Sequence, residues 1–274
     1  MICGERMKKG IFCILLSILN IVLLCSCGAG KSSAEASLPE LVIGGAEYAP
    51  YFYTDTEEYT GIDVELATEA CRRLGYQPVF VSLDLENRAK ALANGNVDCL
   101  WTCLTMDDRE EEYTWAGPYL YTRRVYVVPR ESDIMTTEDL AGKKVSVQAG
   151  STSEEIILSG EVEELANVDT FAVYQSLGEV FMALRRGYVD AMIGHEGALK
   201  IYTEQYPGEY RYLNMDLIRS KLGVAFRKGE DEELAAQLTQ ALWEMTEDGT
   251  TAQILQKYGL DVEQNLYEPQ GGAE

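Results

Sequence analysis

Residues 97–121 read VDCLWTCLTMDDREEEYTWAGPYLY, and this stretch decides how the rest of the chain is interpreted. Its first part, residues 97–101, is apolar enough to predict a strand that is covered on both faces of a sheet. Residues 102–105 then place hydroxyl, thiol and backbone N–H groups at the carboxyl end of that strand. In open α/β sheets this end is where ligands bind. The stretch therefore predicts an α/β sheet with a ligand site at its edge.

Arg109 follows this strand end, four residues after Thr105. A guanidinium beside free backbone donors suits a carboxylate that accepts two parallel hydrogen bonds. The alternative is a charged surface helix, on which Arg109 only pairs with an acid of the run 107–112. We expect Arg109, Thr105 and the nearby Cys103 to form one side of a ligand site.

The chain is strongly acidic, with 45 acidic and 23 basic residues and a formal net charge of −22. Such a surface repels nucleic acid and anionic membranes, which excludes a role in binding a phosphate backbone. A cationic ligand is compatible with this charge, but solubility explains the charge equally well. With 46% hydrophobic and 25% charged residues, the composition is that of a globular chain with room for one large or two smaller domains.

The first 26 residues have the pattern of a signal peptide. Basic residues precede an apolar run over residues 11–24, which is too short for a comfortable membrane span. The run ends in Leu24-Cys25-Ser26-Cys27, which resembles the lipobox of bacterial lipoproteins. We therefore expect a lipid anchor on Cys27 and a flexible tether over residues 27–37, at the outer face of the cell membrane. The alternatives are a plain signal peptide or an uncleaved anchor.

Three cysteines remain after the signal region: Cys71, Cys99 and Cys103. An odd number without paired spacing argues against a disulfide framework. The first two follow apolar patterns and are expected in the core. Because the chain has a single histidine, we expect no metal site, and no motif indicates a cofactor.

Predicted strands and helices alternate along the exported chain. The first set has strands at 41–44, 79–81 and 97–101 and helices at 62–74 and 86–92; the second has strands at 125–129, 145–148, 170–173 and 189–193 and helices at 154–158, 176–186 and 197–205; a strand at 222–227 and helices at 231–247 and 250–258 follow. This order is typical of doubly wound α/β units, so two lobes are expected. Two parallel crossings, near 121–125 and 220–223, would form a hinge beside a cleft.

Both sets place polar groups at the ends of strands. Glu47 and an aromatic cluster follow the first strand, and Gln148 leads into Gly150-Ser151-Thr152 before an acidic helix. Backbone N–H groups and hydroxyls at the positive end of a helix dipole bind anions. The alternative for Ser151 and Thr152 is an ordinary N-cap.

The order of short motifs resembles that of extracytoplasmic solute-binding proteins of family 3, which deliver polar amino acids to ABC transporters. The matching fragments are YAPY (48–51), GIDVELA (61–67), NGNVD (94–98), TMDDR (105–109), GPY (117–119), LAGKKV (140–145), VQAGST (147–152), LRRGYVDA (184–191) and DGT (248–250). The resemblance covers residues 38–260. It implies a two-lobed periplasmic-binding-protein-like fold of type II, with two doubly wound α/β lobes joined by a two-strand hinge. Lobe 1 would comprise residues 38–123 and 222–268, and lobe 2 residues 124–221.

The resemblance also implies roles for individual residues. In the family, an Arg after the third strand holds the α-carboxylate of the ligand, together with groups at the strand end and a Gly-Ser/Thr-Thr segment of the other lobe. Those roles fall to Arg109, Thr105, Ser151 and Thr152. Cys103 stands where a Ser or Gly is common, and Tyr48 would cover the ligand side chain.

His195 departs from the family pattern, because an acidic residue commonly accepts the α-ammonium at this place. A neutral His195 could accept from the ammonium itself, in which case affinity would fall as the pH drops through about 6.5. Glu196 or Glu47 could take the ammonium instead, or the ligand is not an ordinary α-amino acid. A helix N-cap without a ligand role is a further alternative.

Together these observations predict a lipid-anchored, monomeric binding protein that closes on a small zwitterion and presents it to a membrane permease. One alternative is a ligand-sensing partner of a membrane receptor. The other is an enzyme that resembles extracytoplasmic cyclohexadienyl dehydratases, with His195 and Glu196 as an acid/base pair. We expect no catalytic activity, because no nucleophile with a base and an orienting partner is apparent.

Overall fold

The computed structural model describes residues 37–160, 165, 167–213 and 219–267. Two units are distinguished, Met1–Ser37 and Leu38–Glu274, and the architecture below is that of the second. The predicted signal peptide, the lipid anchor on Cys27 and all but the last residue of the tether lie outside the described residues. In the described part of the chain, none of the helices has the length and apolar character needed to cross a membrane.

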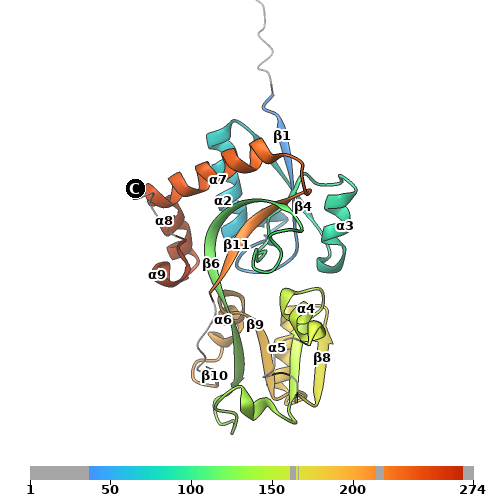
Figure 1. The fold of residues 1–274 in the computed structure, drawn as a ribbon. Helices are drawn as coiled ribbons and strands as arrows, with labels where there is room; N and C mark the ends of the chain where they lie inside the picture. Colours follow the sequence, from blue (N-terminus) through green and yellow to red (C-terminus); the bar gives the residue numbers. More distant parts are fainter. Residues whose placement is uncertain (1–36, 161–164, 166, 214–218, 268–274) are drawn as a thin grey trace, which may run out of the picture. The chain divides into compact units, whose positions relative to one another are not determined.

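A nine-stranded sheet runs through the described residues, in the order β4-β1-β5-β11-β6-β9-β7-β8 with β10 paired to β6 (Figure 1). Its strands are β1 (Glu40–Gly45), β4 (Gln77–Ser82), β5 (Cys99–Leu100), β6 (Thr114–Pro129), β7 (Lys144–Gln148), β8 (Thr170–Tyr174), β9 (Ala191–His195), β10 (Tyr210–Tyr212) and β11 (Arg219–Phe226). A separate hairpin joins β2 (Tyr53–Asp55) to β3 (Glu58–Thr60). The α/β architecture expected from the sequence is therefore present.

Lobe 1 contains β1, β4 and β5 and the helices packed around them. These are α2 (Ile62–Leu74), the 3-10 turn η1 (Leu85–Asn87), α3 (Arg88–Ala93), α7 (Glu232–Glu247), α8 (Thr250–Lys257) and α9 (Val262–Asn265). Helix α2 begins after Gly61 and ends at Gly75, as the glycine pattern predicts, and both glycines have positive φ. It packs on β4, α7 and α8, whereas α3 contacts β1 and β5.

Lobe 2 contains β7, β8 and β9 with α4 (Thr152–Ser159), α5 (Leu177–Arg185) and α6 (Glu196–Thr203), and the 3-10 turn η2 (Glu138–Leu140). Figure 1 shows these elements as the lower lobe. Ser176 and Glu179 form a reciprocal capping box at the start of α5, which fixes where this helix begins. Helices α5 and α6 both contact β9, the strand that ends in His195, and Met192 of this strand packs in one core cluster with apolar residues of both helices.

The connection between the lobes differs from the prediction. A separate strand was expected from residue 125, but β6 is continuous from Thr114 to Pro129 and belongs to both lobes. The two crossing strands, β6 and β11, pair antiparallel rather than parallel. Antiparallel pairing satisfies the backbone groups of both crossings at once. The hinge is therefore a two-stranded ribbon within one sheet.

The strand predicted at 97–101 is shorter than expected. Only Cys99–Leu100 pairs as a strand, between β1 and β11. The carboxylate of Asp98 accepts a hydrogen bond from the backbone N–H of Val42 at 2.7 Å, which replaces a ladder bond at the strand's start. The prediction that the stretch is covered on both faces is confirmed, since the adjacent Cys99 and Leu100, which point to opposite faces, are both buried.

Candidate functional site

Parallel pairing brings the carboxyl ends of several strands to the interface between the lobes. In lobe 1, β1 pairs parallel with β4 and β5; in lobe 2, β7 pairs parallel with β8 and β9. The loops after these strands line a cavity of about 410 Å³. Lobe 1 contributes residues 46–49 and 83–87, and lobe 2 contributes residues 148–149 and 175–177 with Tyr202. Strand ends of an α/β sheet thus form the cavity, as expected for a ligand site.

Three of the predicted site residues line this cavity: Glu47, Tyr48 and Gln148. The carboxylate of Glu47 is exposed and accepts a hydrogen bond from the backbone N–H of Thr54 at 3.1 Å. Gln148 donates from Nε2 to the carbonyl of Gln175, whereas its Oε1 is buried without a hydrogen-bond partner in the described residues. An unused buried acceptor at a cavity wall is suited to a ligand N–H or O–H group.

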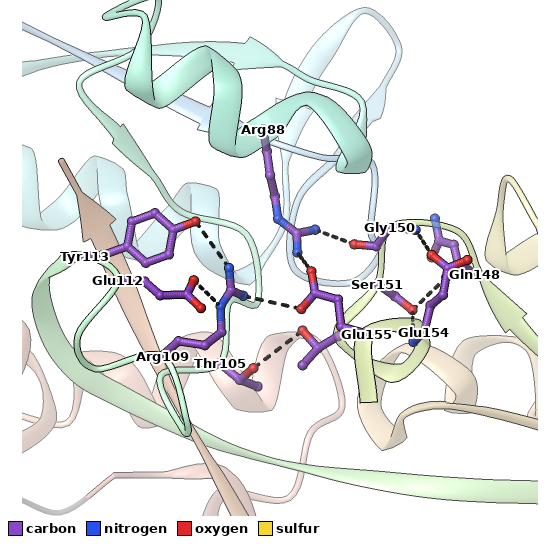
Figure 2. A network of polar contacts seen from close by, with 11 residues as sticks. Arg88, Thr105, Arg109, Glu112, Tyr113, Gln148, Gly150, Ser151, Glu154 and Glu155 are labelled. Carbon is purple, nitrogen blue, oxygen red and sulfur yellow. Dashed lines mark hydrogen bonds and ion pairs between the residues drawn. The ribbon is translucent and has the colours of Figure 1, made fainter. Parts of the chain in front are cut away.

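Arg109 lies in a polar network next to the cavity, with its side chain 12% exposed. Its Nε donates to Glu112 at 3.2 Å and its Nη2 donates to the Tyr113 hydroxyl at 3.3 Å (Figure 2). Its Nη1 is buried, has no hydrogen-bond partner among the described residues, and lies 3.9 Å from Glu155 of lobe 2. Arg109 therefore pairs with a neighbouring acid, Glu112, as the alternative interpretation expects. One guanidinium nitrogen nevertheless faces the other lobe.

Charges on both sides of the interface set the pKa of Arg109. Burial disfavours its charge, but Glu155, Tyr113 and Glu112 favour the charged form, and together they raise the pKa above its ordinary value. Arg109 therefore stays charged at any physiological pH and can bind an anion.

Arg88 is a second guanidinium of this network, and it was not predicted from the sequence. It extends from the start of α3, donates from Nη1 to the carbonyl of Gly150 at 3.0 Å, and donates from Nη2 to Glu155 at 3.4 Å (Figure 2). Its side chain is 7% exposed, and burial lowers its pKa. Arg88 is the first residue of the helix that follows the loop after β4, whose carboxyl end faces the cavity.

The segment 150–152 meets lobe 1 as the resemblance implies, but its hydroxyls are already used. Ser151 is the N-cap of α4: it accepts from the N–H of Glu154 and donates to the carbonyl of Gln148. Thr152 accepts a hydrogen bond from the Thr105 hydroxyl at 3.5 Å, across the interface. The N-cap alternative is therefore correct for Ser151, and Thr105 with Thr152 directly joins the two lobes.

His195 is 5% exposed and contacts both lobes. Its Nδ1 lies 3.2 Å from the hydroxyl of Thr122, its backbone N–H donates to the Tyr48 hydroxyl at 3.4 Å, and its ring meets the ring of Tyr48 edge-on. His195 occupies the N-cap position of α6, but its side chain makes no capping hydrogen bond. The ring is therefore positioned by contacts at the interface and not by the helix end.

The pKa of His195 does not support the predicted pH response. Burial and the neighbouring positive charge of Arg124 lower the pKa of His195 from 6.5 to about 3. The imidazole therefore stays neutral at pH 5.5 as well as at pH 7.5. We therefore expect titration of this ring to leave ligand affinity unchanged near pH 6.5.

Two predicted residues lie away from the cavity. Glu196 accepts two hydrogen bonds from Arg123, at 2.7 and 2.6 Å, and lines a separate pocket of about 420 Å³. Cys103 is buried with φ of 46°, and its N–H donates to the buried carboxylate of Asp63 at 2.6 Å. Because burial also raises the pKa of its thiol, Cys103 is a neutral residue that fixes the loop before Thr105.

Comparison with known proteins places this geometry in context. The family described as bacterial extracellular solute-binding proteins, family 3, matches residues 41–261. The lysine/arginine/ornithine-binding periplasmic protein of Escherichia coli (strain K12) is 30% identical over 254 residues, which cover 88% of this chain and 96% of that protein. A solved structure of an ancestral arginine-binding protein bound to arginine has a TM-score of 0.73 at 29% identity and covers 81% of this chain and 99% of its own. The ancestral amino acid-binding protein AncCDT-1, a precursor of cyclohexadienyl dehydratase, has a TM-score of 0.71 at 26% identity, with 80% and 95% covered.

Proposed function

Because the chain belongs to the bacterial extracellular solute-binding proteins of family 3, we propose that it binds a small amino acid or a related zwitterion outside the cytoplasm. It delivers this ligand to the permease subunits of an ABC transporter. The predicted lipid on Cys27 holds the protein, as a monomer, at the outer face of the cell membrane. The similarity to proteins named for binding arginine, lysine or ornithine supports an amino acid as the ligand class.

The observation that carries this proposal is the position of the Arg109 guanidinium. Its Nη1 is buried without a hydrogen-bond partner in the described residues and is directed at the first turn of α4 in the other lobe. A carboxylate placed there would accept a charge-assisted hydrogen bond from lobe 1 and would lie near the amino end of a helix of lobe 2. One ligand group would thus bind both lobes.

Closure of the lobes gives this binding a mechanism. Ligand contacts that form only when the lobes meet shift the balance between open and closed forms. The interface already contains such lobe-to-lobe contacts, from Arg88 to Gly150 and from Thr105 to Thr152. Glu155 lies beside Arg109 Nη1, so an entering ligand carboxylate replaces a carboxylate of the protein. The lobes must separate to admit it.

The arrangement of His195 and Glu196 weighs against the enzyme alternative. The carboxylate of Glu196 pairs with Arg123, while His195 Nδ1 contacts Thr122. The two side chains therefore do not form the acid/base pair that a dehydratase-like reaction would need. A ligand-sensing partner of a membrane receptor would need the same ligand site as a transport protein. Neighbouring genes for a permease and an ATPase would distinguish transport from sensing.

A thermal-unfolding screen of amino acids and small carboxylates tests the proposed function. A ligand that binds only the folded protein stabilises it by about 2.7 kcal/mol at a hundred times its dissociation constant. We expect at least one amino acid or related zwitterion to raise the melting temperature in a saturable manner, with a calorimetric stoichiometry of one. If every compound leaves the melting temperature unchanged at millimolar concentration, the proposal is wrong.

A further inference from the structure

Arg124 is a partly buried cation whose Nε has no hydrogen-bond partner in the described part of the chain. Its Nε is buried and donates to no acceptor among the described residues, and Arg124 takes part in none of their ion pairs. Burial lowers its pKa, whereas Tyr126, Tyr48 and the carboxylates of Asp107 and Glu155 act in the opposite sense. A buried guanidinium without an anion costs free energy unless a bound group supplies the missing interaction.

The strand geometry places Arg124 at the lobe interface. Successive residues of a strand point to opposite faces, so Arg123 and Arg124 diverge, and Arg123 is the one that pairs with Glu196. Arg124 lies opposite His195 in the register of β6 and β9. Residues directly opposite each other in an antiparallel pair share a face. The ring of His195 in turn meets Tyr48, which lines the cavity.

This face does not suit an ammonium group. The resemblance implies an acid at residue 195, but the residue is a neutral imidazole beside a guanidinium. The carboxylates of the surrounding elements have other partners: Asp107 accepts a hydrogen bond from the backbone N–H of Lys221, and Glu155 pairs with Arg88. Glu196 binds Arg123, Asp63 binds Cys103 and Tyr119, and Glu47 binds the backbone of Thr54. A positively charged group here would be repelled, whereas an anion would find a charged donor.

The charges at the interface also favour an anionic ligand, although the whole chain carries a formal net charge of −22. Three largely buried guanidinium groups, those of Arg88, Arg109 and Arg124, lie along it. Glu155 pairs with Arg88 and Glu112 pairs with Arg109, and each of these two carboxylates is about half exposed. Arg124 is the positive charge left over.

We propose that the ligand is a small dicarboxylate, bound through one carboxylate at Arg109 and through the other at Arg124. This inference rests on the proposed function, because the Arg109 contact is the one proposed there. Acidic amino acids and 2-oxo or 2-hydroxy dicarboxylic acids share this chemistry. The unpartnered Oε1 of Gln148 adds an acceptor that an amino or hydroxyl substituent would satisfy and a 2-oxo group would not.

Calorimetric titrations of the exported protein in mild detergent test this proposal, with glutamate, aspartate, 2-oxoglutarate, glutamine and arginine as the probes. We expect one of the dicarboxylates to bind at least about tenfold more tightly than glutamine and arginine, since a hydrogen bond between charged groups is lost in the amide. A preference for the amino acids over 2-oxoglutarate would indicate that the Gln148 acceptor is used. Equal affinities would assign the recognition to the two carboxylates alone. Both results support the proposal.

Three variants separate a ligand role of Arg124 from a structural one. Arg124→Gln should weaken the preferred dicarboxylate by about tenfold or more and change glutamine binding by less than about threefold. Arg124→Lys keeps the charge and should retain part of the preference, which also controls for loss of folding. His195→Asp supplies an anion beside Arg124 and should reduce dicarboxylate binding while improving that of glutamine.

Three results would overturn the proposal, and they differ in what they leave intact. If glutamine or arginine binds more tightly than every dicarboxylate through Arg109, the second carboxylate is wrong and the proposed function stands. If none of the five probes binds and the broader screen also finds no ligand, both fail. An Arg124→Gln variant that weakens all probes equally, with a lowered melting temperature, would assign Arg124 to the hinge structure.

Discussion

Replacing Arg109 with Ala removes the guanidinium that is proposed to bind the ligand carboxylate. Two of its nitrogens already have partners in the structure, Glu112 and the Tyr113 hydroxyl, so Nη1 is the nitrogen available to a ligand carboxylate. One charge-assisted hydrogen bond contributes about 2 to 3 kcal/mol. We therefore expect the dissociation constant to rise by roughly 30-fold to 140-fold. Displacement of Glu112 by the ligand would free a second nitrogen and raise the loss toward about 5 kcal/mol.

The assay is isothermal titration of the ligand found by the thermal screen, with the wild-type protein and the variant under the same conditions. Arg109→Lys complements it, because a lysine keeps the charge but lacks the planar fork, and we expect an intermediate affinity. Arg72 supplies a matched control: it also pairs with a glutamate three residues away, but its side chain is 70% exposed on α2. Arg72→Ala should leave the dissociation constant unchanged.

The reasoning is refuted if Arg109→Ala binds the ligand within about threefold of the wild type while its melting temperature is unchanged. An equal loss in the Arg72→Ala control would also refute it, because the effect would then reflect net charge rather than the site. A changed affinity only in the Arg109 variants is the predicted result.

Three further changes test other parts of the account. Glu155→Gln removes the carboxylate that faces Arg109. Because Glu155 is about half exposed, we expect ligand affinity to increase by up to about fivefold. Weaker binding in calorimetry would instead show that Glu155 stabilises the closed form of the protein. Gly150→Ala places a Cβ 2.9 Å from the backbone nitrogen of Glu86 in the other lobe, at a φ of +66°. Because this contact blocks closure, we expect ligand affinity to fall by about tenfold or more. An unchanged affinity would show that the lobes need not approach this closely. Burial raises the pKa of Asp63 from 3.8 to about 7, so the folded state binds the proton more tightly and the free energy of unfolding falls as the pH rises from about 4 through 7. Asp63→Asn should abolish that part of the slope, at most about 1.4 kcal/mol per pH unit, in urea unfolding at pH 5, 6, 7 and 8; parallel curves for the two proteins would contradict it.

The sequence predicted the α/β fold because the local signals agree with the tertiary structure. Helix α2 runs between the glycines that were expected to bound it, and Leu41 and Ile43 of β1 and Val145 and Val147 of β7 are buried. The continuity of β6 could not be predicted, since Gly117, Pro118 and two arginines interrupt its pattern. Only the pairing with β11 and β9 makes it one strand.

The site was predictable in part, for a physical reason. Residues at the carboxyl ends of parallel strands are brought to one edge whatever their side chains, which accounts for Glu47, Tyr48 and Gln148 at the cavity. Arg88 was missed because nothing in its local sequence separates it from a surface helix arginine. Arg124 was missed because the alternation along β6 decides which of two adjacent arginines pairs with Glu196.

The distance between a ligand carboxylate oxygen and Arg109 Nη1, in a crystal structure of the liganded protein, tests the central claim most directly. We expect about 2.7 to 2.9 Å, with the Glu155 carboxylate moved away from its present position 3.9 Å from that nitrogen. A ligand held between the lobes while Nη1 still faces Glu155 and contacts no ligand oxygen would contradict the account.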